Sequence, residues 1–125
     1  AYYEHMPVRR SSLPVASEMR LYRRLVFGNL AEISVLDTRQ YRTVQPTGAG
    51  PFVNLGFSST TPTDGNPTGT LLGDAQEKWL FDGLNASQAR WNIVAQQVMV
   101  ARMNFFPQSI GGPNVYNLDQ WDGYG

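Results

Sequence analysis

The chain of 125 residues contains no cysteine, which excludes disulfide bonds, thiolate metal ligands and a cysteine nucleophile within it. Its only histidine is His5, and no Gly-x-Ser-x-Gly motif is present to supply a serine nucleophile. The glycine-rich phosphate-binding patterns Gly-x-x-x-x-Gly-Lys and Gly-x-Gly-x-x-Gly are absent as well. As an isolated unit, the chain therefore does not contain a complete catalytic site of any of these kinds.

Charge of either sign is scarce and balanced. Ten basic and ten acidic residues give a net charge of zero, so no global field attracts nucleic acid or an anionic membrane, and no nucleic-acid-binding signature is present. No apolar run approaches the roughly 18 residues of a transmembrane helix. Lys78 is the only lysine, against nine arginines. This bias fits oxyanion recognition or, as the preferred interpretation, a GC-rich genome.

The hydrophobic pattern predicts strands on both sides of a helix. Residues 17–24 suggest a short helical turn, and Gly28-Asn29 suggests a turn or bulge. Residues 30–36 read as a strand with Ile33 and Val35 on one face, and residues 91–100 read as a buried strand. Strand, helix and strand in this order are typical of an α/β layered fold.

The helix between these strands is expected to begin at Asp74 and to end near residue 85. Asp74 and Glu77 have the spacing of a capping box, in which each side chain accepts a backbone amide hydrogen. An apolar stripe formed by Trp79, Leu80 and Leu84 should pack on the sheet.

A long loop is expected before this helix. Residues 45–70 contain four prolines and five glycines, with no sustained hydrophobic periodicity. The preferred interpretation is a surface insertion with no role in chemistry.

The chemically richest segment directly follows the first predicted strand. It places Asp37, Arg39 and Arg42 at the carboxyl end of that strand, where open α/β sheets bind ligands. Guanidinium groups match phosphate or carboxylate oxygens in pairs. Arg39 could bind a substrate phosphate and neutralise transition-state charge, or it could form a structural ion pair with Asp37. The sequence favours the ion pair.

Five segments stand out in order along the chain: Tyr2–Arg9, Phe27–Glu32, Leu36–Arg42, Leu72–Leu80 and Asp119–Tyr124. They resemble successive blocks of the D-type (PhoD-like) alkaline phosphatases, a group that includes secreted calcium-dependent phospholipase D enzymes. The resemblance implies part of a calcineurin-like metallophosphoesterase sandwich, with two β-sheets flanked by helices and metal ions at the carboxyl ends of the strands. It also implies a secreted, periplasmic or cell-wall location.

The resemblance further implies that residues 1–125 are the central segment of a metallophosphoesterase catalytic domain. The Asp-rich metal-binding blocks of the family and its Gly-Asp-Val-His-type motif do not occur here. The expected partners are therefore the N-terminal and C-terminal segments of the same enzyme, together with a phosphate ester or phospholipid substrate. The expected cofactors are calcium and, as a second candidate, iron.

Candidate site residues follow from this resemblance. Arg39 and His5 are expected in catalysis, and Arg9 and Arg42 in substrate binding. Gln97 stands where many relatives carry a metal-binding histidine, and an amide oxygen suits calcium better than zinc. The alternatives are a packed, hydrogen-bonded His5 and a buried Gln97 that satisfies backbone groups.

Two other functions remain open at this point. A structural or interaction domain without catalytic activity would give the same strand–helix–strand pattern. A small anion-binding module centred on Arg39 and Arg42 would bind phosphate without turnover. The resemblance favours metal-dependent hydrolysis of phosphate mono- or diesters, and the sequence does not distinguish monoester, diester and phospholipid substrates.

Overall fold

A computed structural model of the chain describes residues 2–7, 9–16, 18–44, 57–58, 69–101, 103–105, 115–121 and 124. Most of the loop expected over residues 45–70 lies outside these residues. The secondary-structure elements are α1 (Tyr2–His5), the 3-10 helix η1 (Arg10–Ser12), β1 (Arg23–Phe27), β2 (Ala31–Val35), β3 (Phe57–Ser58), α2 (Asp74–Ala86), β4 (Trp91–Ala95) and β5 (Tyr116–Asn117). Within the described residues, no helix is long and apolar enough to cross a membrane.

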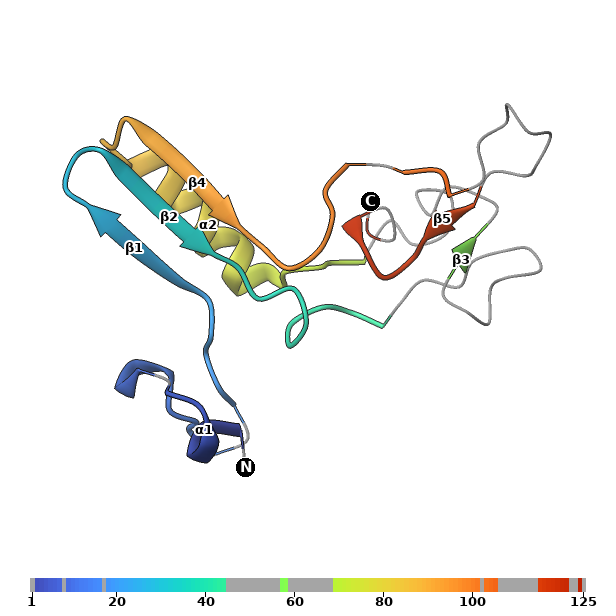
Figure 1. Ribbon diagram of the computed structural model, residues 1–125, viewed down its shortest axis with the longest axis horizontal. Coiled ribbons are helices and arrows are strands. Elements are labelled where there is room, and N and C mark those ends of the chain that lie inside the picture. Colours follow the sequence, from blue (N-terminus) through green and yellow to red (C-terminus); the bar gives the residue numbers. More distant parts are fainter. Residues whose placement is uncertain are drawn as a thin grey trace.

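A three-stranded mixed sheet in the order β1–β2–β4 forms the centre of the fold, and α2 covers one of its faces (Figure 1). β1 and β2 pair antiparallel, whereas β2 and β4 pair parallel and are connected through α2. The strand–helix–strand prediction and the α/β class are thus confirmed. A separate two-stranded sheet is formed by β3 and β5.

The helical turn predicted over residues 17–24 is wrong. Arg23 and Arg24 instead begin β1, which forms a hairpin with β2. The turn between the strands contains Gly28 with a φ of 55°, a left-handed conformation that glycine adopts without steric strain. Pairing along five residues of β2 overrides the weak helical preference of a segment too short to form a stable helix.

The helix α2 lies where it was predicted, but its N-terminus is capped differently. Its N-cap is Gly73, and no side chain caps it, so the predicted capping box does not form. Asp74 and Glu77 lie in the first turn, where their negative charge is favourable near the positive end of the helix dipole. The helix ends at Ala86 with Ser87 as its C-cap, as expected.

The predicted apolar stripe of α2 packs on the sheet. Leu80 is buried with Leu36 and Leu72, and these three residues form the core cluster. Trp79 and Leu84 of the stripe pack against this cluster while remaining partly exposed. Apolar contacts thereby fix the helix to the residue that directly follows β2.

The sheet face beneath α2 also carries an ion pair. Arg24 Nε lies 2.8 Å from Glu32 Oε1, and Arg24 Nη2 donates to the Trp79 carbonyl over 3.2 Å. The guanidinium group lies over the Trp79 ring, 4.5 Å from its centroid. It passes the helix at Gly83, where a Cβ atom would stand only 1.7 Å from Arg24 Nη2. Glycine at position 83 therefore leaves the space that the Arg24 guanidinium group occupies next to α2.

On the opposite face of the sheet, the described residues leave several apolar side chains exposed. Register and strand alternation place Leu25, Ile33 and Ile93 on this face, together with Trp91. Trp91 is 62% exposed and Ile93 is 45% exposed. The strand β4 ends at Ala95, so it is shorter than the strand predicted over residues 91–100. It is also not buried among the described residues, because β4 is an edge strand whose side chains are mostly exposed.

Candidate functional site

The candidate site begins at the turn that leaves the carboxyl end of β2. Leu36, Asp37 and Thr38 are all buried there. Asp37 Oδ1 accepts the backbone N–H groups of Arg39 over 3.0 Å and of Gln40 over 3.1 Å. An aspartate that accepts amides two and three residues ahead closes a tight local turn. The Asp37 carboxylate thus shapes the backbone that presents Arg39.

Two glutamines hold this turn from neighbouring elements. From α2, the fully buried Gln76 accepts the Asp37 N–H over 2.7 Å and donates to the Asp37 carbonyl over 2.8 Å. From the end of β4, Gln97 accepts the N–H and the hydroxyl of Thr38 over 3.2 and 2.7 Å, and donates to the Leu36 carbonyl over 2.8 Å. Each primary amide bridges a backbone donor and a backbone acceptor, so the turn is tied to both elements.

The described residues do not themselves assemble a metal site. Among them, no group of three His, Asp or Glu side chains comes together. The Gln97 amide oxygen is occupied by Thr38, and the Asp37 carboxylate accepts backbone amides. Asp122, another acid of this part of the sequence, lies outside the described residues. A metal contact by Gln97 remains a prediction, while its contacts with the backbone are observed; the expectation that it is buried is wrong, because the residue is exposed.

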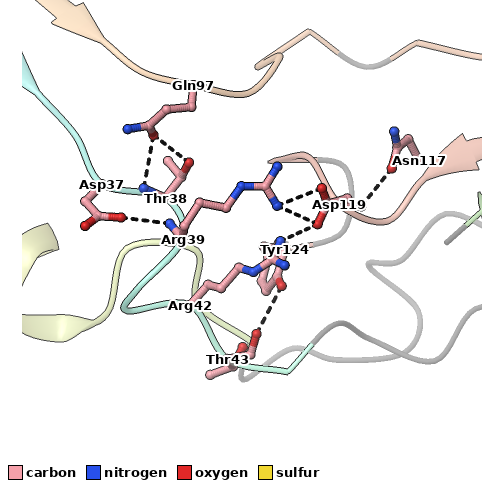
Figure 2. Close-up of polar contacts among 9 residues, drawn as sticks. All are labelled: Asp37, Thr38, Arg39, Arg42, Thr43, Gln97, Asn117, Asp119 and Tyr124. Atoms are coloured by element: carbon pink, nitrogen blue, oxygen red, sulfur yellow. Dashed lines mark hydrogen bonds and ion pairs between the residues drawn. The ribbon is translucent and has the colours of Figure 1, made fainter. Parts of the chain in front are cut away.

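The most concentrated charge at the site is a cluster of two arginines and one carboxylate (Figure 2). Arg39 Nη1 donates to both Asp119 oxygens, over 2.9 and 2.7 Å, and Arg42 Nη1 donates to Asp119 Oδ1. Asp119 belongs to the turn after β5 and is 80 residues from Arg39 in the sequence. The predicted Asp37–Arg39 ion pair is therefore wrong in its partner, because Asp119 supplies the carboxylate.

The arginines hold Asp119 ionised. Burial alone raises the pKa of Asp119, but hydrogen bonds from Arg42 and Arg39 outweigh it, and the pKa lies below its usual value. The hydrogen bond with Asp119 in turn raises the pKa of Arg42. The buried Tyr124 lies next to the cluster and donates its hydroxyl to the Thr43 carbonyl over 3.1 Å. Burial raises the pKa of this phenol. With two guanidinium groups and one carboxylate, the cluster carries a net charge of about +1 at neutral pH.

Two adjoining cavities open at the carboxyl end of the sheet, each of about 370 Å³. Asp37, Arg39 and Gln97 line one of them. The other is lined by Arg9, and again by Gln97. The structure thus brings three of the predicted site residues, Arg39, Arg9 and Gln97, to one region, and Arg42 joins them through Asp119.

His5 is placed differently. It is an exposed residue in α1, and it does not line either cavity. In Figure 1, α1 lies apart from the carboxyl ends of β2 and β4. The described residues therefore give His5 no contact with the arginine cluster, and its catalytic role remains a prediction.

Three contributors to the site had no assigned role in the sequence analysis. Asp119 pairs with the arginines, and Gln76 and Thr38 fix the turn. Asp119 lies in a family-like block, which was the only signal that marked it. Its partners are about 80 residues away, and no local spacing rule joins residues so far apart.

The arrangement has the donors that an anion requires. Arg39 lines the open cavity, Arg42 is held beside it by Asp119, and guanidinium groups can donate paired hydrogen bonds to a tetrahedral oxyanion. The described residues at the cavity that Arg39 lines include no cysteine, serine or histidine that could act as a nucleophile. The cluster can therefore bind and stabilise charge, and further groups are needed for bond cleavage.

Comparisons with known proteins agree with the sequence blocks. The sequence model of the PhoD-like phosphatases matches residues 1–125. Alkaline phosphatase D of Bacillus subtilis (strain 168) is 48% identical over 124 residues, which are 99% of this chain and 20% of that protein. A solved structure described as the structure of PhoD superposes with a TM-score of 0.76 at 44% identity, over 98% of this chain and 22% of that one. The chain spans about a fifth of the length of this curated relative, and it belongs to the PhoD-like phosphatase family.

Proposed function

We propose that this chain is one segment of a longer enzyme that hydrolyses phosphate mono- or diesters. The observation that carries the proposal is the Arg39–Arg42–Asp119 cluster, of which Arg39 lines an open cavity, in a chain of the PhoD-like phosphatase family. We refer to this longer protein as the full-length enzyme. Its other segments supply the nucleophile and the proton-transfer groups, since the described residues at this cavity do not.

In this proposal, the arginines act on the phosphoryl oxygens. Of the Arg39 nitrogens, only Nη1 donates hydrogen bonds to the Asp119 carboxylate. The Arg39 side chain is half-exposed and lines the cavity. Its remaining N–H groups donate to two oxygens of the substrate phosphoryl group and orient it. As negative charge shifts between these oxygens during displacement, the fixed cation stabilises the transition state.

The bare sheet face supports a second part of the proposal. In the full-length enzyme, the apolar face with Ile33, Trp91 and Ile93 packs against another sheet, as in a calcineurin-like sandwich. An apolar face of this kind is stable in water only when another layer covers it. The other segments of the enzyme are thus the proposed partners of this chain.

Metal dependence is proposed on the family resemblance alone. Among the described residues no group of three His, Asp or Glu side chains forms, and we propose that the ligands for calcium or iron come mainly from other segments. A bound metal ion would supply Lewis-acid chemistry at the phosphoryl group. Export to the periplasm, cell wall or medium is also proposed on the family resemblance alone. The same holds for activity on phospholipids.

The decisive assay uses the full-length enzyme with p-nitrophenyl phosphate and bis(p-nitrophenyl) phosphate. We expect hydrolysis of at least one of them, and we expect Arg39→Gln to lower kcat/KM about 100-fold. Arg90→Gln is the matched control, because Arg90 is exposed and lies outside the cavities. Chelation followed by addition of calcium tests the metal requirement. Absence of turnover on both esters under all metal conditions would refute the proposal.

A second candidate function is anion binding without turnover. It is favoured by one observation: the described residues contain the arginine cluster but no nucleophile at its cavity. Inorganic phosphate that binds the full-length enzyme and is lost in Arg39→Gln, without hydrolysis of either ester, would support it.

A further inference from the structure

Asp119 joins two distant parts of the chain at the candidate site. The turn after β5 brings its carboxylate between Arg39 and Arg42, which follow β2. We propose that Asp119 is a positioning residue that orients both guanidinium groups for one phosphoryl oxyanion. This inference rests on the proposed function, because it assigns a role in the same site.

The contacts of Arg39 show what Asp119 leaves available. Only Nη1 of Arg39 reaches the carboxylate, and it bonds to both oxygens. Among the described residues, Nε and Nη2 of Arg39 have no acceptor. The side chain is 50% exposed and lines the cavity with Asp37 and Gln97. Asp119 thus fixes one corner of the guanidinium group, and the other donors stay free for a ligand.

Arg42 is held more tightly by the same carboxylate. Its side chain is 24% exposed, half the value for Arg39, and its Nη1 also donates to Asp119 Oδ1. Because one oxygen accepts from both arginines, the two guanidinium groups are kept close together despite their like charge. We call Arg39 and Arg42, held together by the Asp119 carboxylate, the arginine fork.

The carboxylate is itself held in place. The Asp119 backbone N–H donates to Asn117 Oδ1 over 2.8 Å, which closes the turn after β5. The next turn residues include Trp121, which packs against the core cluster and donates to Gln96 after β4. The position of Asp119 therefore depends on the same core that fixes the turn after β2.

Orientation and charge have opposite effects on catalysis when Asp119 is neutralised. Loss of the carboxylate raises the positive potential of the cavity, which favours binding of an anionic substrate. It also frees two side chains that must be aligned in the transition state. Positioning therefore predicts a fall in kcat per folded molecule without a rise in KM, whereas partial unfolding lowers only the folded fraction and leaves both kcat per folded molecule and KM unchanged.

The first test is Asp119→Asn in the full-length enzyme. We expect kcat on p-nitrophenyl phosphate to fall about tenfold, with KM unchanged or lower. We expect Asp119→Glu to recover part of the loss. Asp82→Asn is the matched control, since Asp82 pairs only with Lys78 on the exposed surface of α2. An unchanged kcat per folded molecule would overturn the inference.

A double-mutant cycle tests whether Asp119 acts through the arginines. In the background of Arg39→Gln with Arg42→Gln, we expect Asp119→Asn to change kcat by less than about twofold. The full tenfold loss in that background would overturn the inference, because the carboxylate would then act by another route.

A structural readout separates this inference from the proposed function. Crystal structures of the full-length wild type and of Asp119→Asn, both soaked with inorganic phosphate, should differ in the arginine fork. We expect both guanidinium groups to converge on one point in the wild type and to separate in the variant. Unmoved arginines in the variant would overturn the inference, whether or not the enzyme hydrolyses esters.

Discussion

Two arginine–carboxylate clusters in this chain have opposite surroundings. Arg24 and Glu32 lie between the sheet and α2, with side chains only 21% and 14% exposed, and the guanidinium group is stacked on Trp79. Arg39 lines a cavity and is 50% exposed, and its partner Asp119 is 35% exposed. The first arginine uses its donors on the protein, whereas the second keeps donors free. Similar chemistry therefore supports the fold in one place, and in the other it leaves donors for the ligand binding that we propose.

The largest effect is expected at the cavity. Replacing both Arg39 and Arg42 by glutamine in the full-length enzyme should lower kcat/KM about 1000-fold, because two transition-state donors are lost. The unfolding midpoint should fall less than that of Arg24→Ala, since the Arg39–Asp119 pair is exposed and such pairs contribute about 0–1 kcal/mol to stability, while the less exposed Arg42 contributes the rest of the change. Steady-state kinetics and thermal unfolding of the same preparation check both parts. A large fall in the midpoint with normal kinetics would make this cluster structural, like the Arg24–Glu32 pair.

The next effect concerns the bare sheet face. Ile93→Lys in the full-length enzyme should lower the free energy of unfolding by about 3 kcal/mol, because a charge would be buried under the covering layer. Gln88→Lys, at an exposed position beyond α2, should change it by less than about 0.5 kcal/mol. Denaturant unfolding measures both values. Equal stability of the two variants would show that this face stays bare in the enzyme.

A smaller loss of stability is expected from Arg24→Ala. Removing the guanidinium group leaves Glu32 half-buried beneath α2 without its partner, which should cost about 2 kcal/mol. The activity per folded molecule should be unchanged. Lys78→Gln is the control, because the exposed Lys78–Asp82 pair should contribute less than about 0.5 kcal/mol. A change in KM for Arg24→Ala, at normal stability, would place Arg24 in the site instead.

The smallest effects are those of pH. The pKa of Asp119 is lowered in the folded chain, so its contribution to stability is present above its usual value of 3.8 and is lost as pH falls through the folded value. The pKa of Tyr124 is raised, so its contribution is present below 10.0 and is lost as pH rises through the folded value. Unfolding midpoints of Tyr124→Phe should lose the alkaline part of this dependence. An identical alkaline profile in that variant would contradict the assignment.

The sequence predicted most of what depends on local pattern. The period of apolar residues predicted α2 and the strands that became β2 and β4, and the residue types after β2 indicated the arginines that the structure gathers there. The hairpin of β1 was missed because its stability comes from pairing with β2, which a weak local helical preference does not reveal. The capping box failed because Gly73, and not Asp74, occupies the N-cap.

The candidate site was predicted only in part. Arg39 and Arg42 were identified, but the carboxylate between them comes from a turn about 80 residues away, and Gln76 joins the site from α2. These contacts form only when the elements pack together. No spacing rule along a single sequence predicts which distant residues then meet. The family resemblance placed the right segments in order without showing which side chains meet.

The central claim is that the two clusters divide structure from function. The most direct measurement compares Arg24→Ala with the Arg39→Gln, Arg42→Gln double variant in the full-length enzyme, recording kcat/KM per folded molecule and the free energy of unfolding for each. We predict that the first variant loses stability with its catalysis intact, and that the second loses catalysis with a smaller loss of stability. Equal losses of both properties in the two variants would contradict the account.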